Sequence, residues 1–144
     1  MRPVPGHFLH VAVGGVAWSL DDVRAELERG REALASLAAF DATYRHLNCF
    51  HSAVVAEVGE GRDAFVNATR RIRPELDTRF ALPHVTIAIA TGAISPDPLR
   101  RVLVPLHDEE LGSQRVDEIT LCAVPAGRST LLMPWTVVGR ATLA

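Results

Sequence analysis

Two histidines occupy equivalent positions in a repeated segment of this chain. Residues 9–13 read Leu-His-Val-Ala-Val, and residues 83–87 read Pro-His-Val-Thr-Ile. After a loop, each segment leads to a serine followed two positions later by an aspartate, at Ser19 and at Ser95, which is typical of a helix start. A match that continues from a short apolar strand into a capped helix indicates an internal duplication. It predicts two lobes related by a pseudo-twofold axis.

The alternation of side chains along a strand predicts where the two histidines point. In the second copy, Val85 and Ile87 share one face, whereas His84 and Thr86 share the other. We expect the aliphatic face to pack under the helices, and the polar face to leave room for a ligand. By the same alternation His10 lies on the polar face of the first copy. The pseudo-twofold axis would then bring both histidines to opposite sides of one groove.

Two facing histidines can carry acid–base catalysis. Imidazole has an unperturbed pKa of about 6.5, so it donates or accepts a proton near neutrality. One histidine can take a proton from an attacking water or hydroxyl while the other protonates the leaving oxygen. Each such transfer is typically worth about 10²–10⁴-fold in rate. The hydroxyl of Thr86 lies two residues after His84 and could hold a phosphate oxygen in line, with no metal needed.

Residues 82–87 (Leu-Pro-His-Val-Thr-Ile) closely resemble the second signature of the 2H phosphoesterase superfamily, which reads His, hydrophobic, Thr or Ser, hydrophobic. His10 lies where the first signature should be, and residues 116–121 are similar to the start of the family's closing hairpin. The resemblance implies a bilobal α+β fold, with two pseudo-symmetric antiparallel lobes, helices outside and a central groove. It also implies metal-independent opening or forming of 2',3'- or 2',5'-type phosphoester bonds, as in cyclic phosphodiesterases and bacterial 2'-5' RNA ligase-like proteins. By this resemblance His10 and His84 would be the acid–base pair, and Thr86 would bind the phosphate.

One residue departs from the family pattern. The first signature normally has Thr or Ser where this chain has Ala12. Losing one charge-assisted hydrogen bond to a phosphate costs roughly 1.5–3 kcal/mol, or about 10- to 150-fold in affinity or rate. Ser52, Thr91 or a water could replace the hydroxyl. Two alternatives therefore stay open: a nucleotide- or RNA-end-binding module without turnover, and an isomerase or cyclase that uses the same groove on a non-phosphate metabolite.

We consider several other side chains as metal ligands, groove residues or phosphate-binding residues. No Cys/His spacing of the zinc type is present, so we expect neither a metal nor another cofactor. Cys49 and Cys122 are expected to be small buried residues, and Trp135 could line a groove. The expected partner is a nucleotide or RNA-end phosphoester substrate, with no membrane and no obligatory protein partner. Four arginines near expected strand ends or loops could hold a phosphate: Arg45, Arg79, Arg128 and Arg140.

Composition excludes several function classes. The chain has 144 residues, of which 48% are hydrophobic and 22% charged, as in an ordinary globular domain. All its basic residues are arginines, so Schiff-base chemistry and a P-loop lysine are excluded. The formal net charge of −2 argues against a strongly basic nucleic-acid coat. Residues 1–6 contain no apolar signal core, and we predict a cytoplasmic protein.

Local patterns predict the elements that must position these side chains. The mixture of short apolar runs and amphipathic segments predicts a single α+β domain over residues 1–144. Helices are expected to open at Ser19 and Ser95 and to span 62–76. Strands are expected near 7–16, 44–58, 83–91, 116–124 and 131–142, with a possible break near Asn48.

Overall fold

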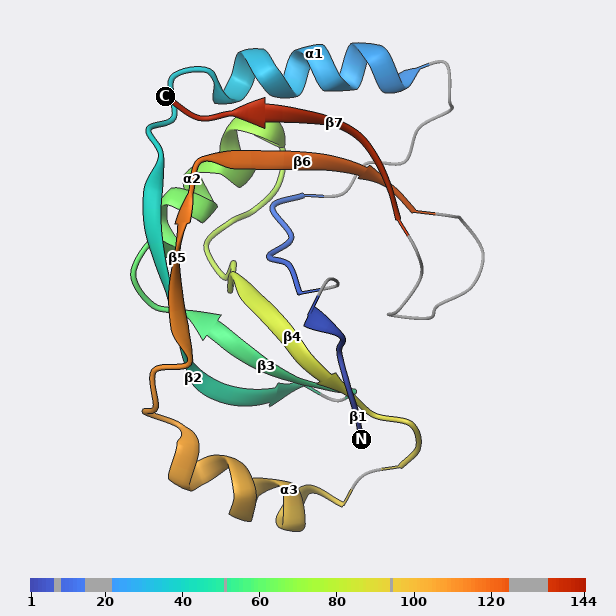
Figure 1. The fold of residues 1–144 in the computed structure, drawn as a ribbon, viewed down its shortest axis with the longest axis vertical. Helices are drawn as coiled ribbons and strands as arrows, with labels where there is room; N and C mark the ends of the chain where they lie inside the picture. The colour runs from blue at the N-terminus through green and yellow to red at the C-terminus, as the bar shows by residue number, and fades with distance from the viewer. Residues whose placement is uncertain (7–8, 15–21, 51, 94, 125–134) are drawn as a thin grey trace.

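Three α-helices and seven strands make up the described part of the chain in the computed structural model (Figure 1). The structure describes residues 1–6, 9–14, 22–50, 52–93, 95–124 and 135–144. The helices are α1 (Val23–Leu34), α2 (Arg62–Ile72) and α3 (Pro96–Leu103), and the 3-10 turn η3 (Val104–Leu106) continues α3. The strands are β1 (Arg2–Pro3), β2 (Phe40–Phe50), β3 (Ala53–Val58), β4 (His84–Ile89), β5 (Gly112–Val116), β6 (Glu118–Ala123) and β7 (Thr136–Thr142). None of the helices in these ranges is long and apolar enough to cross a membrane.

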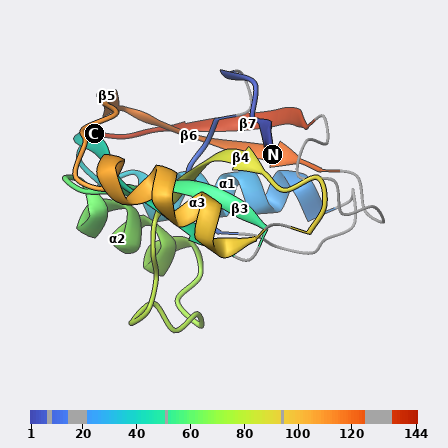
Figure 2. The same cartoon turned by 90° about the horizontal axis from the view of Figure 1, so that it is seen from below.

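The strands form two antiparallel sheets. The larger sheet has the order β1-β4-β3-β2-β5, and the smaller sheet pairs β6 with β7. Figure 1 shows α1 along the smaller sheet at one end of the molecule and α3 at the opposite end. Figure 2 shows α2 on one side and the β6–β7 pair on the other. The expected α+β class, with antiparallel sheets and helices on the outside, is confirmed.

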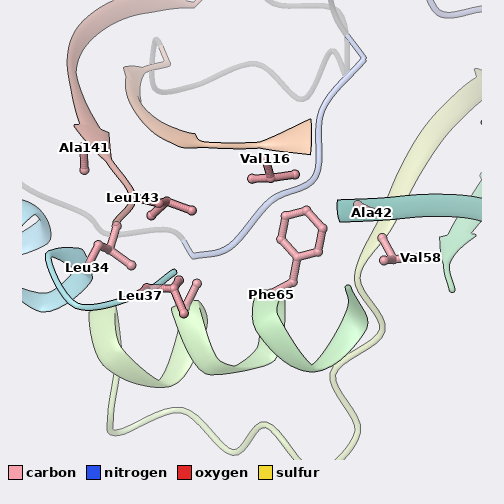
Figure 3. Close-up of a cluster of buried hydrophobic side chains, with 9 residues drawn as sticks. Leu34, Leu37, Ala42, Val58, Phe65, Val116, Ala141 and Leu143 are labelled. Carbon is pink, nitrogen blue, oxygen red and sulfur yellow. The ribbon is translucent and has the colours of Figure 1, made fainter. Parts of the chain in front are cut away.

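The main core lies where α1 and α2 meet the two sheets. Phe65 and Ala68 of α2 are buried, as their helical spacing requires, and Leu34 of α1 packs into the same cluster. Figure 3 shows Phe65 pointing from α2 toward Ala42 and Val116 of the larger sheet. The central strand β3 is a short, nearly continuous apolar run, which fits a strand buried on both faces.

Two further contacts position the outer helices. Leu103 of α3 belongs to a second buried cluster with Leu47 of β2 and Ala56 of β3. At the other end of the molecule, α1 lies so close to β7 that a Cβ on Gly139 would be 2.5 Å from a methyl carbon of Leu27. Glycine is therefore required at this approach unless the leucine side chain moves.

One sequence expectation at the N-terminal end needs correction, and a second one falls outside the described residues. The strand expected near 7–16 is reduced, within described residues 9–14, to a single bridge between Val11 and Val85. Instead, the short strand β1 pairs with the neighbouring part of β4, where Arg2 lies opposite Ile89. Helix α1 begins at Val23 with Asp22 at its N-cap, and the expected cap Ser19 lies outside the described residues.

Two glycine substitutions test the fold, and we expect them to change the free energy of unfolding in opposite directions. Gly61 has φ +81° at the N-cap of α2, and an added Cβ would lie 2.5 Å from the carbonyl oxygen of Asp41. We expect Gly61→Ala to lower the free energy of unfolding by about 1–3 kcal/mol, because both the backbone and the contact are unfavourable. Gly30 lies inside α1 with open space around its Cβ position. Gly30→Ala should raise the free energy of unfolding by roughly 0.5–1 kcal/mol.

Urea unfolding of both variants measures the difference. A neutral Gly61→Ala would show that α2 does not begin against Asp41 in the way described.

Candidate functional site

A single antiparallel bridge brings the two histidine motifs together. Val11 and Val85 are the second residues of the two motifs, each directly after its histidine, and they pair with each other. The bridge is antiparallel and isolated, so it joins the two motifs at this one pair of residues.

The alternation expected along β4 holds from His84 to Thr86, and the register with β3 shifts at Ile87. Val85 is buried, with 8% of its surface exposed, and Ile87 packs against the cluster that contains Leu103 of α3. His84 and Thr86 lie on the other face of β4 and are half-buried. Ile87 thus packs toward α3, and His84 and Thr86 remain partly accessible.

His84 is held in one orientation by two contacts. Its Nδ1 lies 2.7 Å from the carbonyl oxygen of Leu82. Because a carbonyl oxygen only accepts, Nδ1 carries the proton, and the lone pair of the neutral ring is on Nε2. The ring of Phe50 packs edge-on against the imidazole, with the ring centres 4.9 Å apart. These contacts fix both the tautomer and the direction of Nε2.

His10 has a different environment. It is exposed, and its ring meets the ring of Trp135 edge-on, with centres 4.8 Å apart. Trp135 follows directly after residues 125–134, which lie outside the described part of the chain. The expectation that this tryptophan lines a groove is confirmed, because it forms part of a cavity wall together with His10.

This cavity has a volume of about 1250 Å³ and lies between the N-terminal segment, the larger sheet and β6. Val85 and Ile87 of β4 line this cavity, whereas His84 and Thr86 do not. The expectation that both imidazoles line one groove is therefore wrong for this cavity. Residues 9–14 form no ladder on either side of Val11, so the strict alternation assumed for the first copy does not hold there.

Polar groups on the cavity wall come from the larger sheet and β6. Burial raises the pKa of Tyr44, and a hydrogen bond from the Gln114 side chain partly offsets the shift. Tyr44 is thus a neutral phenol at neutral pH. Burial also raises the pKa of the Cys122 thiol, which disfavours the thiolate that a cysteine nucleophile requires. Cys122 is a half-buried free thiol, whereas Cys49 is exposed. The expectation that Cys49 is buried is therefore wrong.

Of the four candidate arginines, Arg140 lines the cavity. It lies in the wall and pairs with Glu118 at 3.2 Å. Arg79 is engaged with Asp77 and lowers the pKa of that carboxyl. Arg45 packs its stem against the position of Gly59 and has a buried Nε. Arg128 lies outside the described residues.

Comparisons with known proteins identify the fold. No family model and no curated protein matches the sequence. Escherichia coli LigT in complex with 3'-AMP superposes with a TM-score of 0.69 at 18% identity, over 99% of this chain and 80% of that chain. TT0787 of Thermus thermophilus gives a TM-score of 0.68 at 16% identity, over 99% of this chain and 81% of that chain. A solved phosphoesterase gives a TM-score of 0.67 at 19% identity, with coverage of 99% and 81%.

Proposed function

The chain has the LigT-like fold, as its resemblance to the 2H phosphoesterases implies, and from this premise we propose that it is a metal-independent phosphoesterase. Its substrates would be 2',3'-cyclic or 2',5'-linked nucleotide or RNA phosphoesters. The observation that carries the proposal is the Val11–Val85 bridge, which joins the two histidine motifs at equivalent residues. The complexes of LigT with 3'-AMP and with NADP+ support a nucleotide as the class of ligand.

The tautomer of His84 suggests a division of roles in hydrolysis. With Nδ1 donating to Leu82, the lone pair of Nε2 can accept a proton from a water that attacks phosphorus. As the new P–O bond forms, one ester P–O bond of the cyclic phosphate breaks, and protonated His10 gives its proton to the leaving ribose oxygen. The hydroxyl of Thr86 donates to a non-bridging phosphate oxygen. In the reverse direction the two histidines exchange roles.

The proposal requires one side-chain movement. The His10 imidazole packs against Trp135 and lines the cavity, whereas His84 does not line it. A rotation about the side-chain bonds of His10 toward Thr86 would place both imidazoles on the same face of the bridge. A substrate phosphate bound at Thr86 favours that rotation, because its negative charge attracts a protonated imidazole.

Hydrolysis of defined phosphoesters tests the proposal directly. The chain is incubated with nucleoside 2',3'-cyclic monophosphates and with 2',5'-linked dinucleotides in the presence of EDTA, and products are separated by chromatography. Hydrolysis that persists in EDTA is expected. Absence of product from every phosphoester, with tight binding of nucleotide, would support the binding module without turnover instead.

The binding-module alternative rests on Ala12, and a substitution there separates the two functions. Ala12 directly follows the bridged Val11, and its side chain is exposed. We expect Ala12→Thr to raise kcat/KM for a cyclic phosphate by about 10- to 150-fold, because the added hydroxyl donates one hydrogen bond to a charged phosphate. Ala12→Val is the matched control, with the same shape and no hydroxyl. Equal activities of the two variants would contradict the role assigned to the missing hydroxyl.

A further inference from the structure

A second cluster of chemically active side chains lies apart from the histidine motifs. His46, His107 and Asp108 have ligand atoms that all lie within 4.8 Å of one another. His46 belongs to β2, whereas the other two residues directly follow η3. None of the three is among the residues that line the cavity.

The backbone at His46 is unusual. It has φ +55°, and it is the only residue other than glycine with a positive φ in the described part of the chain. The register of β2 against β3 shifts at this point, between Arg45 and Leu47. A bulge of this kind re-aims a side chain, and a left-handed conformation is unfavourable for any residue with a Cβ. Such a conformation persists at places where the geometry serves a function.

The His46 side chain is also incompletely satisfied. Its Nδ1 is buried and has no hydrogen-bond partner among the described residues. The nearest opposite charge is Asp108, whose Oδ1 lies 3.6 Å from this nitrogen. A buried ring nitrogen without a partner is uncommon, and a bound ion is one of its physical explanations.

His107 is oriented as a metal ligand would be. Its Nδ1 lies 3.1 Å from the carbonyl oxygen of Leu47, so Nδ1 donates and the lone pair is on Nε2. Histidines that bind metals commonly donate their other N–H to a backbone carbonyl, which fixes the ring and the tautomer. The centres of the His46 and His107 rings are 5.1 Å apart.

From this geometry we propose that His46, His107 and Asp108 form a zinc site. Imidazole and carboxylate ligands suit Zn²⁺, which takes Zn–N and Zn–O bonds of about 2.0–2.2 Å in tetrahedral geometry. Tetrahedral ligand atoms at those bond lengths lie about 3.4 Å apart, and the His46–Asp108 separation is already 3.6 Å. The three side chains leave the fourth position to a water. The ion would tie the segment after η3 to the bulge of β2.

Zinc titration of the metal-free chain tests this proposal. Calorimetry is expected to show one Zn²⁺ per chain, and Co²⁺ in its place should give the intense visible absorption of a tetrahedral site. His46→Gly keeps the backbone conformation, because glycine readily adopts a positive φ. Asp108→Asn removes an exposed carboxylate charge. Each variant should bind Zn²⁺ at least tenfold more weakly, since even changes outside the ligand set cost 10–100-fold.

Two controls locate the ion. Glu109→Gln changes the next carboxylate along the chain, outside the cluster, and should leave zinc affinity unaltered. The double variant His10→Ala/His84→Ala should also bind Zn²⁺ as the wild type does. The proposal is overturned if His46→Gly and Asp108→Asn retain full affinity, or if the double variant loses it. Because these readouts involve no phosphoester, they stand apart from the proposed phosphoesterase activity.

Discussion

Replacing His84 with alanine is expected to lower the rate of 2',3'-cyclic nucleotide hydrolysis by about 10²–10⁴-fold, the usual contribution of one positioned proton transfer. The loss should appear mainly in kcat, because Nε2 acts on the reacting atoms and contributes little to holding the nucleotide. His10→Ala should have an effect of the same size. The double variant should be about as slow as either single variant, because the two histidines act as a unit.

A matched variant separates chemistry from structure at this position. The His84 Nδ1–H donates to Leu82, and the imidazole packs against Phe50. In His84→Asn the amide nitrogen can replace the Nδ1 donor, but nothing replaces Nε2. We therefore expect His84→Asn to unfold in urea like the wild type and to be as inactive as His84→Ala. Full activity in His84→Asn would remove His84 from the catalytic pair, whatever the behaviour of the alanine variant.

The parts of the fold that follow from local patterns were predictable from the sequence. Alternation correctly placed the buried Val85 on the opposite face from His84 and Thr86, but it does not continue through Ile87, where the pairing with β3 shifts. The pattern of residues 62–76 predicted α2 and placed Phe65 and Ile72 on its core face, but the helix ends at Ile72, and Leu76 of the expected span is exposed. A single sequence was therefore enough to find this helix but not its C-terminal end.

The N-terminal copy shows where local pattern stops being sufficient. Residues 9–13 have a composition similar to residues 83–87, but only Val11 is bridged. Whether an apolar run becomes a strand depends on a free strand edge beside it, and β1 already occupies part of the β4 edge. The position of the His10 ring against Trp135 was likewise not predictable, because the two residues are far apart in the sequence.

The proposed zinc cluster was not predictable for a related reason. The expectation of no metal rested on the absence of a short Cys/His spacing, whereas the structure places His46 beside His107 and Asp108, about sixty positions away. The left-handed conformation of His46 was not predictable, since only a few per cent of residues other than glycine have a positive φ. Phe50, which orients His84, was missed because it lies on the neighbouring hairpin rather than in either motif.

The stability of the whole arrangement depends on the core around Phe65. Its side chain is 4% exposed, and its ring packs edge-on against that of Phe40 with centres 4.9 Å apart. Phe65→Ala should lower the free energy of unfolding by about 3–5 kcal/mol, because a buried aromatic is lost and a cavity remains. That loss is a large fraction of the roughly 5–15 kcal/mol typical of a domain, so urea denaturation should shift to a clearly lower midpoint.

Phe80→Ala is the matched control for this core prediction. Phe80 is 87% exposed, so removing its ring should change the free energy of unfolding by less than about 0.5 kcal/mol. Equal effects of the two substitutions would contradict the described packing of α2 against the sheets.

Phe65 also lines the cavity, whereas none of the three residues of the zinc cluster does. At temperatures where Phe65→Ala remains folded, its zinc affinity should therefore equal that of the wild type. A parallel loss of stability and zinc binding would instead show that the β2 bulge depends on this core.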